Sequence, residues 1–136
     1  MKISVCMIVK DEEKNLARCL ESLQRQEIFD EFVIVDTGSK DKTIEIAKGF
    51  GIEPIIPEPD DLDSLFVKTK FGKKINFSAA RNYSIDQATG DWLFFIDADE
   101  EIVGDLSGLP RFLELQELTT DGVAFWMVDV RGGPVA

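Results

Sequence analysis

The segment Trp92-Leu93-Phe94-Phe95-Ile96-Asp97-Ala98-Asp99-Glu100-Glu101 joins an apolar run to a dense group of acidic residues. The apolar run predicts a buried strand. Asp97 and Asp99 are two residues apart, so both can turn toward one point at the end of this strand. Such a cluster repels itself unless a cation or a proton donor lies within it. Mg²⁺ suits the cluster, because one or two carboxylates often share it with the phosphates of a substrate. The alternative is a solvated acidic turn after a core strand.

Strand-like and helix-like patterns alternate on both sides of this segment. Further strands are predicted at Ile3–Val9, at Glu31–Asp36, at 52–56 around Pro54, and at 122–131. Helices are predicted at 12–26 with Asp11 as N-cap, at 43–50, at 79–89 with Ser78 as N-cap, and at 106–118. Residues 57–76 lack periodicity and predict a long, mobile loop, and the tail 132–136 is predicted to fray.

This alternation predicts an α/β fold, in which three layers form a Rossmann-like sandwich around a mostly parallel central sheet. With 136 residues, the chain is expected to form a single domain over 1–136. Ligands of such sheets bind at the carboxyl ends of the strands. Lys10-Asp11-Glu12, Asp36 and Asp97-Ala98-Asp99 each follow or end a predicted strand. We therefore expect polar groups from three strands to converge on one edge, which a chance acidic turn would not require.

Composition narrows the functional classes. The chain is 44% hydrophobic and 30% charged, so it is expected to be globular. Its net charge of −11 argues against non-specific binding to nucleic acid or to anionic membrane, since both require a basic face. The chain contains no histidine, so acid–base chemistry would fall to carboxylates or lysines.

The cysteines and the apolar segments indicate a reducing compartment. Cys6 lies in a strand-like run and Cys19 on the apolar side of the next predicted helix, so both are expected to be reduced core residues. No signal peptide is recognisable, and no run approaches the roughly 18 apolar residues of a membrane span. A cytoplasmic protein without a transmembrane segment is therefore expected.

Two further side chains have competing interpretations. Asp36 is followed by Thr37-Gly38-Ser39, where glycine permits a tight turn or a positive φ. Its carboxylate can accept hydrogen bonds from a nucleotide base or a ribose, or it can simply cap the turn. Arg81 falls in the first turn of a predicted helix, where the helix dipole does not favour a cation. It can contact a phosphate, pair with Asp97, or lie on a solvated surface.

Taken together, the motifs resemble those of a known family. Their order along the chain is Ile3–Val9 with Lys10-Asp11-Glu12, then Val35-Asp36-Thr37-Gly38-Ser39-Lys40-Asp41-Lys42-Thr43, Ser78-Ala79-Ala80-Arg81-Asn82, Ala88-Thr89-Gly90-Asp91-Trp92 and Asp97-Ala98-Asp99-Glu100. In this order the chain resembles family 2 glycosyltransferases of the GT-A fold, over about residues 3–103. Within that family it is most similar to the bacterial branch that includes lipopolysaccharide-core and related β-glucosyltransferases.

The resemblance implies binding of a nucleotide-diphospho-sugar donor and transfer of its sugar to a glycan, lipid-linked or protein acceptor. The implied nucleotide-sugar-binding residues are Val9, Lys10, Glu12, Asp36, Ser39, Arg81 and Asp97. Among them, Asp36 would contact the base or ribose and Arg81 the ribose or diphosphate. Asp97 and Asp99 would hold Mg²⁺ or Mn²⁺. The family inverts the anomeric centre by direct displacement, with a carboxylate base that deprotonates the acceptor hydroxyl.

One part of the family pattern is not found. The base normally lies in a C-terminal acceptor half, whereas this chain ends about 37 residues after Asp99. Asp129 comes too early to be assigned as the base, and Glu100 and Glu101 are expected beside the metal. The catalytic residue therefore stays unassigned, and a donor-binding GT-A domain truncated after its metal-binding half is expected. The alternative is a non-catalytic nucleotide-sugar-binding or partner-interaction domain. A truncated sheet edge near Phe125-Trp126-Met127 would favour a homo-oligomer or a partner chain that covers it.

Overall fold

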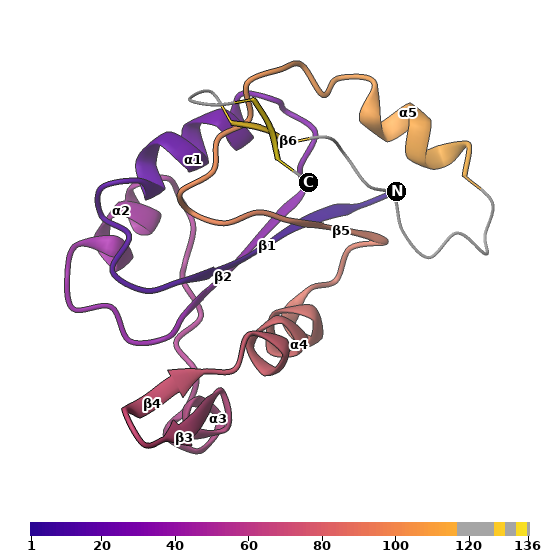
Figure 1. The fold of residues 1–136 in the computed structure, drawn as a ribbon. Helices are drawn as coiled ribbons and strands as arrows, with labels where there is room; N and C mark the ends of the chain where they lie inside the picture. The colour runs from indigo at the N-terminus through magenta and orange to yellow at the C-terminus, as the bar shows by residue number, and fades with distance from the viewer. Residues whose placement is uncertain (117–126, 130–132, 136) are drawn as a thin grey trace.

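A three-stranded parallel sheet forms the centre of the molecule. The computed structural model describes residues 1–116, 127–129 and 133–135. Strand β1 (Ile3–Val9) lies between β2 (Glu31–Asp36) and β5 (Trp92–Phe95), and it pairs with both in parallel (Figure 1). Each strand is an apolar run, as expected for a sheet that is covered on both faces. The predicted α/β fold with a parallel sheet is confirmed.

Helices cover the two faces of this sheet. Helices α1 (Leu16–Gln24) and α2 (Thr43–Gly49) pack together on one face, and α4 (Phe77–Gln87) lies against β1 and β2 on the other. Successive residues of a strand point to opposite faces. Accordingly, the odd-numbered residues Val5, Met7 and Val9 join the core beneath α1, whereas Cys6 packs with a separate cluster that includes Tyr83 of α4. The three-layer arrangement follows directly from this alternation.

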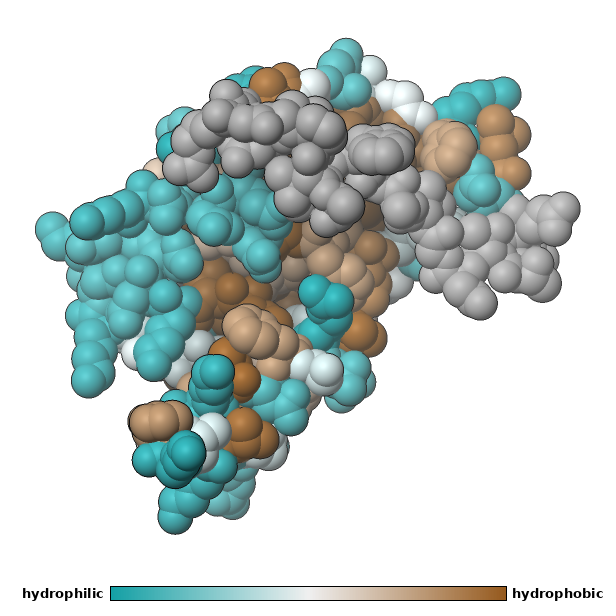
Figure 2. Space-filling model, in the orientation of Figure 1, coloured by the Kyte–Doolittle hydropathy of each residue, from teal (hydrophilic) through white to brown (hydrophobic). Residues whose placement is uncertain are grey.

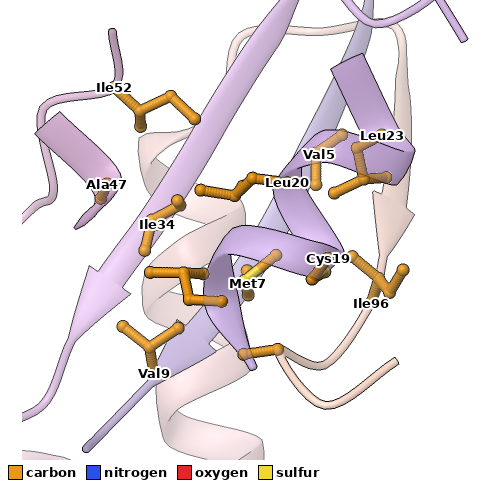
Figure 3. Close-up of a cluster of buried hydrophobic side chains, with 12 residues drawn as sticks. Val5, Met7, Val9, Cys19, Leu20, Leu23, Ile34, Ala47, Ile52 and Ile96 are labelled. Carbon is orange, nitrogen blue, oxygen red and sulfur yellow. The ribbon is translucent and has the colours of Figure 1, made fainter. Parts of the chain in front are cut away.

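The larger core cluster is drawn in Figure 3. Leu20 and Cys19 of α1 lie in one cluster with Met7 and Val5 of β1 and with Ile34 of β2. All five side chains are buried. Because protein interiors are close-packed, a side chain lost here would leave a cavity.

The two helices whose starts were predicted from capping residues begin elsewhere. Helix α1 begins at Leu16 after Asn15, not at residue 12, and Asp11 is not its N-cap. Asp11 instead adopts a left-handed φ of 52°, and its Oδ1 accepts a hydrogen bond from Lys40 N at 2.7 Å. Helix α4 is capped by Asn76, whose Oδ1 accepts from Ala79 N at 3.2 Å, and not by Ser78. Asn76 thus takes over the capping bond of α4, whereas Asn15 occupies the N-cap position of α1 without a capping bond from its side chain.

The strand predicted at 52–56 is reduced to a single bridge. Ile55 N donates to Ile34 O at 2.8 Å and Asp36 N donates to Ile55 O at 2.9 Å, which extends the sheet by one residue beside β2. Pro54 has no N–H and cannot donate to a sheet ladder, so pairing does not continue.

The long loop predicted at 57–76 is wrong. This stretch contains helix α3 (Pro59–Ser64) and an antiparallel hairpin formed by β3 (Phe66–Thr69) and β4 (Gly72–Ile75). Gly72 lies in the turn with a φ of +108°, a conformation that favours glycine. In Figure 1 this unit lies away from the central sheet, below α4.

The last elements are short. Helix α5 (Leu109–Glu114) replaces the helix predicted at 106–118, of which residues 117 and 118 lie outside the described part. Most of the strand predicted at 122–131 also lies outside it, including Phe125 and Trp126 of the expected open edge. The backbone of β6 (Met127–Asp129) pairs with β7 (Gly133–Val135), so residues 133–135 of the predicted frayed tail form a strand.

A close approach fixes β5 beside β1 at the amino ends of the strands. Gly90 N donates to Ser4 Oγ at 2.9 Å, and Ser4 Oγ in turn donates to Glu31 on β2. A methyl group at Gly90 would collide with Ser4 Oγ and lie 2.9 Å from Ser4 N. The hydrogen bond from Ser4 Oγ, with one from Thr89 N, lowers the pKa of the Glu31 carboxyl.

Among the described residues, none of the helices is long and apolar enough to cross a membrane.

Candidate nucleotide-binding edge

The carboxyl ends of β1, β2 and β5 lie on one edge of the sheet because all three strands run in parallel. Val9 is paired with Asp36, so β1 and β2 end level with each other. Strand β5 ends opposite Cys6, three residues before the end of β1. The acidic turn after β5 is therefore set back along the sheet from Asp36. The predicted convergence on one edge is observed, with this offset.

Asp36 is the most constrained polar residue of the edge. Its side chain is buried, and Oδ1 accepts hydrogen bonds from Gly38 N and Ser39 N, both at 2.9 Å. Gly38 has a φ of +123°, which glycine tolerates. Oδ2 is also buried, but it has no hydrogen-bond partner in the described part of the chain. Turn capping therefore accounts for one oxygen only, and the other is a buried acceptor that a donor group from a ligand would satisfy.

The loop after β1 and the loop after β2 are tied together beside Asp36. Asp11 N donates to Ser39 Oγ at 2.9 Å, and Glu12 N donates to Thr43 Oγ1 at 2.8 Å. Glu12 O accepts from Asn15 N and Leu16 N, which begins the first turn before α1. Ser39 and Glu12 thus hold the loops in place. These bonds orient the backbone around the carboxylate of Asp36.

Val9 and Lys10 have different positions although they are adjacent. The Val9 side chain is buried in the core, and its carbonyl accepts from Thr37 N at 3.0 Å. Lys10 is exposed, and its Nζ lies 6.0 Å from the centre of the Phe66 ring on β3. Lys10 therefore links the edge of the sheet to the hairpin by a weak cation–π contact.

The acidic turn after β5 exposes Asp97 and Asp99. Asp97 N donates to Glu100 Oε1 at 2.8 Å, while Glu100 N donates to Asp97 O at 3.0 Å, so the turn closes on itself. Ala98 between them is buried in the core. Neither the Asp97 nor the Asp99 carboxylate forms a hydrogen bond or ion pair within the described residues. Both carboxylates are thus available to a ligand.

The negative charges of the acidic turn affect the pKa of a neighbouring thiol, that of Cys19. Cys19 Sγ lies 3.6 Å from Asp97 O and donates to it. Burial, followed by the charges of Glu100, Asp99 and Asp97, raises the pKa of the Cys19 thiol to about 12. The described residues contain no group of three or more cysteine or carboxylate ligands that could hold a metal alone. Two exposed carboxylates instead match a cation that is shared with phosphates.

Glu101 is not directed into the acidic turn. Its carboxylate forms an ion pair with Arg18 Nε at 3.1 Å, on the α1 side of the turn. Glu100 accepts the hydrogen bond from Asp97 N that is described above. Both residues are thus neighbours of the turn with partners of their own.

Arg81 is the fifth residue of α4, just beyond the predicted first turn, because the helix begins at Phe77 and not at residue 79. Its side chain is exposed. Its Cζ lies 5.0 Å from the centre of the Phe95 ring, over the last residue of β5. No ion pair between Arg81 and Asp97 is formed among the described residues. The arginine is held at the same edge by an aromatic face, and its N–H groups are left for an anion.

Several contacts at this edge were not predicted from the sequence. Among them are the thiol of Cys19 on the carbonyl of Asp97 and the contact between Lys10 and Phe66. Each joins segments that are far apart in the sequence, and no local spacing signals either of them.

A parallel sheet with acidic side chains at its carboxyl edge is the architecture of nucleotide-binding α/β proteins. The chain belongs to glycosyl transferase family 2, whose sequence profile matches residues 4–135. The predicted family is therefore confirmed, whereas the lipopolysaccharide-core branch stays a prediction.

Curated relatives are longer proteins. A TPR repeat-containing protein of Synechococcus elongatus is 41% identical over 102 residues, which are 75% of this chain and 21% of that protein. The SPbeta prophage-derived glycosyltransferase SunS of Bacillus subtilis is 35% identical over 117 residues, or 82% and 24%. Glycosyltransferase AglE of Haloferax volcanii is 33% identical over 136 residues, or 98% and 39%. The chain thus spans between about a fifth and two fifths of the length of these relatives.

Solved structures support the fold. Glucosyl-3-phosphoglycerate synthase from Mycobacterium tuberculosis, in complex with UDP, superimposes with a TM-score of 0.62 at 25% identity, over 89% of this chain and 41% of that one. The same enzyme was also solved with Mg²⁺ and UDP, with a TM-score of 0.56 at 25% identity, over 71% and 33%. S. aureus TarS 1–349 in complex with UDP gives 0.63 at 23% identity, over 92% and 38%. These similarities confirm the GT-A fold.

Proposed function

We propose that this chain binds a nucleoside-diphosphate sugar at the carboxyl edge of its sheet and serves sugar transfer with inversion to an acceptor hydroxyl. The buried, unpartnered Oδ2 of Asp36 is the observation that carries this proposal. A buried acceptor without a donor destabilises the folded protein, and a base N–H or ribose hydroxyl would satisfy it. That structures at 25% identity hold UDP supports the choice of ligand.

In this proposal the diphosphate lies between two charged groups. Asp97 and Asp99 would hold Mg²⁺ or Mn²⁺, since carboxylate oxygens suit a hard cation. When bound, the cation would supply Lewis-acid stabilisation to the leaving diphosphate. Arg81 and Lys10, both exposed at this edge, would attract the phosphate oxygens directly.

The other predicted nucleotide-sugar-binding residues would contribute by holding the loops around the site. Ser39 and Glu12 hold the two loops around Asp36 by the hydrogen bonds described above. Val9 fills the core beneath them and presents backbone rather than side chain to the edge. We infer that these three residues shape the nucleoside pocket, while Asp36 provides its specific contact.

A donor-binding domain that does not itself catalyse transfer is the second candidate. The three carboxylates that follow Asp99 most closely in the sequence have partners: Glu100 and Glu101 as given above, and Asp105 through Ser107 N at 2.8 Å. None of these three is free to act as the general base. This observation favours donor binding with slow hydrolysis over efficient transfer by this chain alone. Turnover on the order of 1–10³ s⁻¹ by the isolated chain would contradict it.

Isothermal titration with UDP, in EDTA and then in Mg²⁺, tests the donor site. Asp36→Asn retains the oxygen that accepts from Gly38 and Ser39 but replaces Oδ2 by an amide donor. It should weaken UDP binding in both buffers by roughly 10- to 100-fold, as expected for a hydrogen bond to a buried charge. Its stability should change little, because the neutral amide places an unpaired buried N–H group where the unpaired charged oxygen was. UDP binding that is unaffected in EDTA would leave Asp36 as a turn residue only.

The metal assignment is tested with Asp99→Asn in the same titrations. This variant should lose the gain in affinity that Mg²⁺ gives and keep the affinity measured in EDTA. Asp86→Asn on the exposed side of α4 is the matched control and should behave like the parent chain in both buffers. A full Mg²⁺-dependent gain in Asp99→Asn would refute the metal assignment. Because the two readouts are separate, the nucleoside and metal assignments can fail independently.

A further inference from the structure

The hairpin formed by β3 and β4, residues 66–75, differs in charge from the rest of the molecule; we call it the basic hairpin. It contains Lys68, Lys70, Lys73 and Lys74 and no acidic residue, in a chain whose net charge is −11. The strongly negative net charge of the whole chain therefore gives no sign of this short basic segment. Composition alone predicted no basic face.

The lysines of the basic hairpin are neutralised only in part. Helix α3 packs against β3 and carries three aspartates, of which one forms an ion pair with a hairpin lysine in the described part of the chain. The strand register places Lys68 directly opposite Lys73, and like charges opposite each other destabilise an antiparallel pair. Lys73 Nζ lies 3.4 Å from Asp63 Oδ1 of α3, in an exposed ion pair. Lys68 and Lys74 have no ion pair with any described residue. An external anionic partner would relieve this repulsion.

The turn of the basic hairpin carries an apolar side chain in full contact with water. Phe71 is 91% exposed, and Lys70 Nζ lies 5.4 Å from the centre of its ring. Val67, which is paired with Lys74, is also exposed. Figure 2 shows hydrophobic and hydrophilic residues side by side on this projecting end of the molecule. Phe71 contributes little to the core, so the fold does not explain its presence.

We infer that the basic hairpin docks on an anionic lipid surface, with Phe71 inserted at the level of the headgroups. Aromatic and basic residues together are the combination that binds such interfaces. Each lysine near an anionic leaflet adds to the attraction. The inference stands on the hairpin alone and does not require donor binding.

The placement of the lysines favours a surface over a small anion. Paired residues share a face of the hairpin, so Lys68 and Lys73 lie on one face and Lys74 on the other. A single phosphate can meet only one face, whereas headgroups on both sides of an inserted turn can meet both. Since Lys10 contacts Phe66 at the base of the hairpin, docking would bring the candidate nucleotide-binding edge close to the lipid.

Vesicle co-sedimentation tests this inference on the 136-residue chain. Vesicles of phosphatidylcholine with phosphatidylglycerol are compared with pure phosphatidylcholine at low and at high salt. We expect binding at least about ten times tighter to the anionic vesicles, and a loss of this preference at high salt because exposed charges are screened. Equal binding to both lipids, or none to either, would overturn the inference.

A pair of matched double variants locates the surface. Lys70→Glu with Phe71→Ser changes the turn of the basic hairpin. Arg111→Glu with Phe112→Ser makes the same type of change at another exposed basic–aromatic pair, on α5. The hairpin variant should lose vesicle binding by about ten-fold or more, while the α5 variant retains it. Equal loss in both would show a non-specific charge effect and reject the hairpin as the docking site.

Two further measurements separate the rival partners. UDP titration of the hairpin variant should give the affinity of the parent chain. A loss of UDP affinity with unchanged vesicle binding would identify the hairpin as part of the donor site instead. A single-stranded oligonucleotide that binds more tightly than anionic vesicles would point to nucleic acid and also reject the inference. Circular dichroism confirms that each variant is folded.

Discussion

The candidate nucleotide-binding edge and the basic hairpin both contain several charged residues, but only the edge holds such a side chain in a buried, hydrogen-bonded position. Asp36 is buried, and backbone N–H groups hold one of its oxygens. In the basic hairpin the lysines and Phe71 are exposed to solvent, and of these lysines Lys73 alone forms an ion pair with a described residue. Polar groups that are fixed in advance bind a ligand with little ordering cost, whereas the hairpin must gain its order from its partner. The comparison teaches that burial distinguishes a preformed site from an adaptable surface.

The contrast between buried and exposed side chains is tested first in the core, where a substitution is expected to have the largest effect on stability. Leu20→Ala should lower the free energy of unfolding by about 2–5 kcal/mol, because it leaves a cavity beneath α1. Urea denaturation followed by circular dichroism measures the change. A loss under about 1 kcal/mol would mean that this layer packs more loosely than the structure shows.

Overpacking at the amino ends of the strands should have the next largest effect. Gly90→Ala forces a methyl group onto Ser4, and we expect a loss of about 1–3 kcal/mol in the same denaturation. Gly104→Ala is the matched control, since a methyl group there meets no atom within 4 Å. If both variants lost equal stability, the close approach of Gly90 to β1 would not be the cause.

A smaller effect is expected from pH. Burial raises the pKa of Cys6 to about 11 and that of Cys19 to about 12, both above the ordinary thiol value. Above about pH 9 the unfolded chain loses thiol protons that the folded chain retains, so stability falls as pH rises and is unaffected below it. The slope for each thiol is about 1.4 kcal/mol per pH unit. In Cys19→Ala the slope above pH 9 should be shallower, and an identical slope would exclude Cys19 as a source.

The smallest effect is predicted in the basic hairpin. Phe71→Ala should change the free energy of unfolding by no more than about 0.5 kcal/mol, because the ring is almost fully exposed. The urea midpoint, compared with that of Leu20→Ala, measures the contrast between the two regions. A loss above about 1 kcal/mol would show that Phe71 supports the fold, and this would weaken the case for a docking role.

The sequence predicted those parts of the fold that depend on local patterns better than those that depend on contacts between distant segments. Apolar runs located β1, β2 and β5 because a buried strand needs little beyond its own side chains. The start of α1 was missed because Asp11 and Glu12 are tied to the loop after β2, a contact across distant segments. The hairpin was missed because its two strands have four residues each and lie among prolines and acidic residues.

The positions of the candidate site residues were likewise predicted only where they follow from local patterns in the sequence. Strand ends are visible in the sequence, and they placed Asp36 and the acidic turn on one edge. That Oδ1 of Asp36 accepts backbone hydrogen bonds while Oδ2 has no partner among the described residues was not predictable, since it depends on the path of the backbone through Gly38 and Ser39. The stacking of Arg81 on Phe95 likewise depends on how α4 lies against β5.

The two thiols provide one reporter for each layer of the sandwich. Cys19 is enclosed on the α1 side of the sheet and Cys6 on the α4 side, and the chain has no other cysteine. An alkylating reagent can reach either sulfur only when its layer opens, so the modification rate of each records how often that layer separates. Mass spectrometry of the two cysteine-containing peptides would therefore measure the opening rates of the α1 side and the α4 side separately, in the unaltered protein.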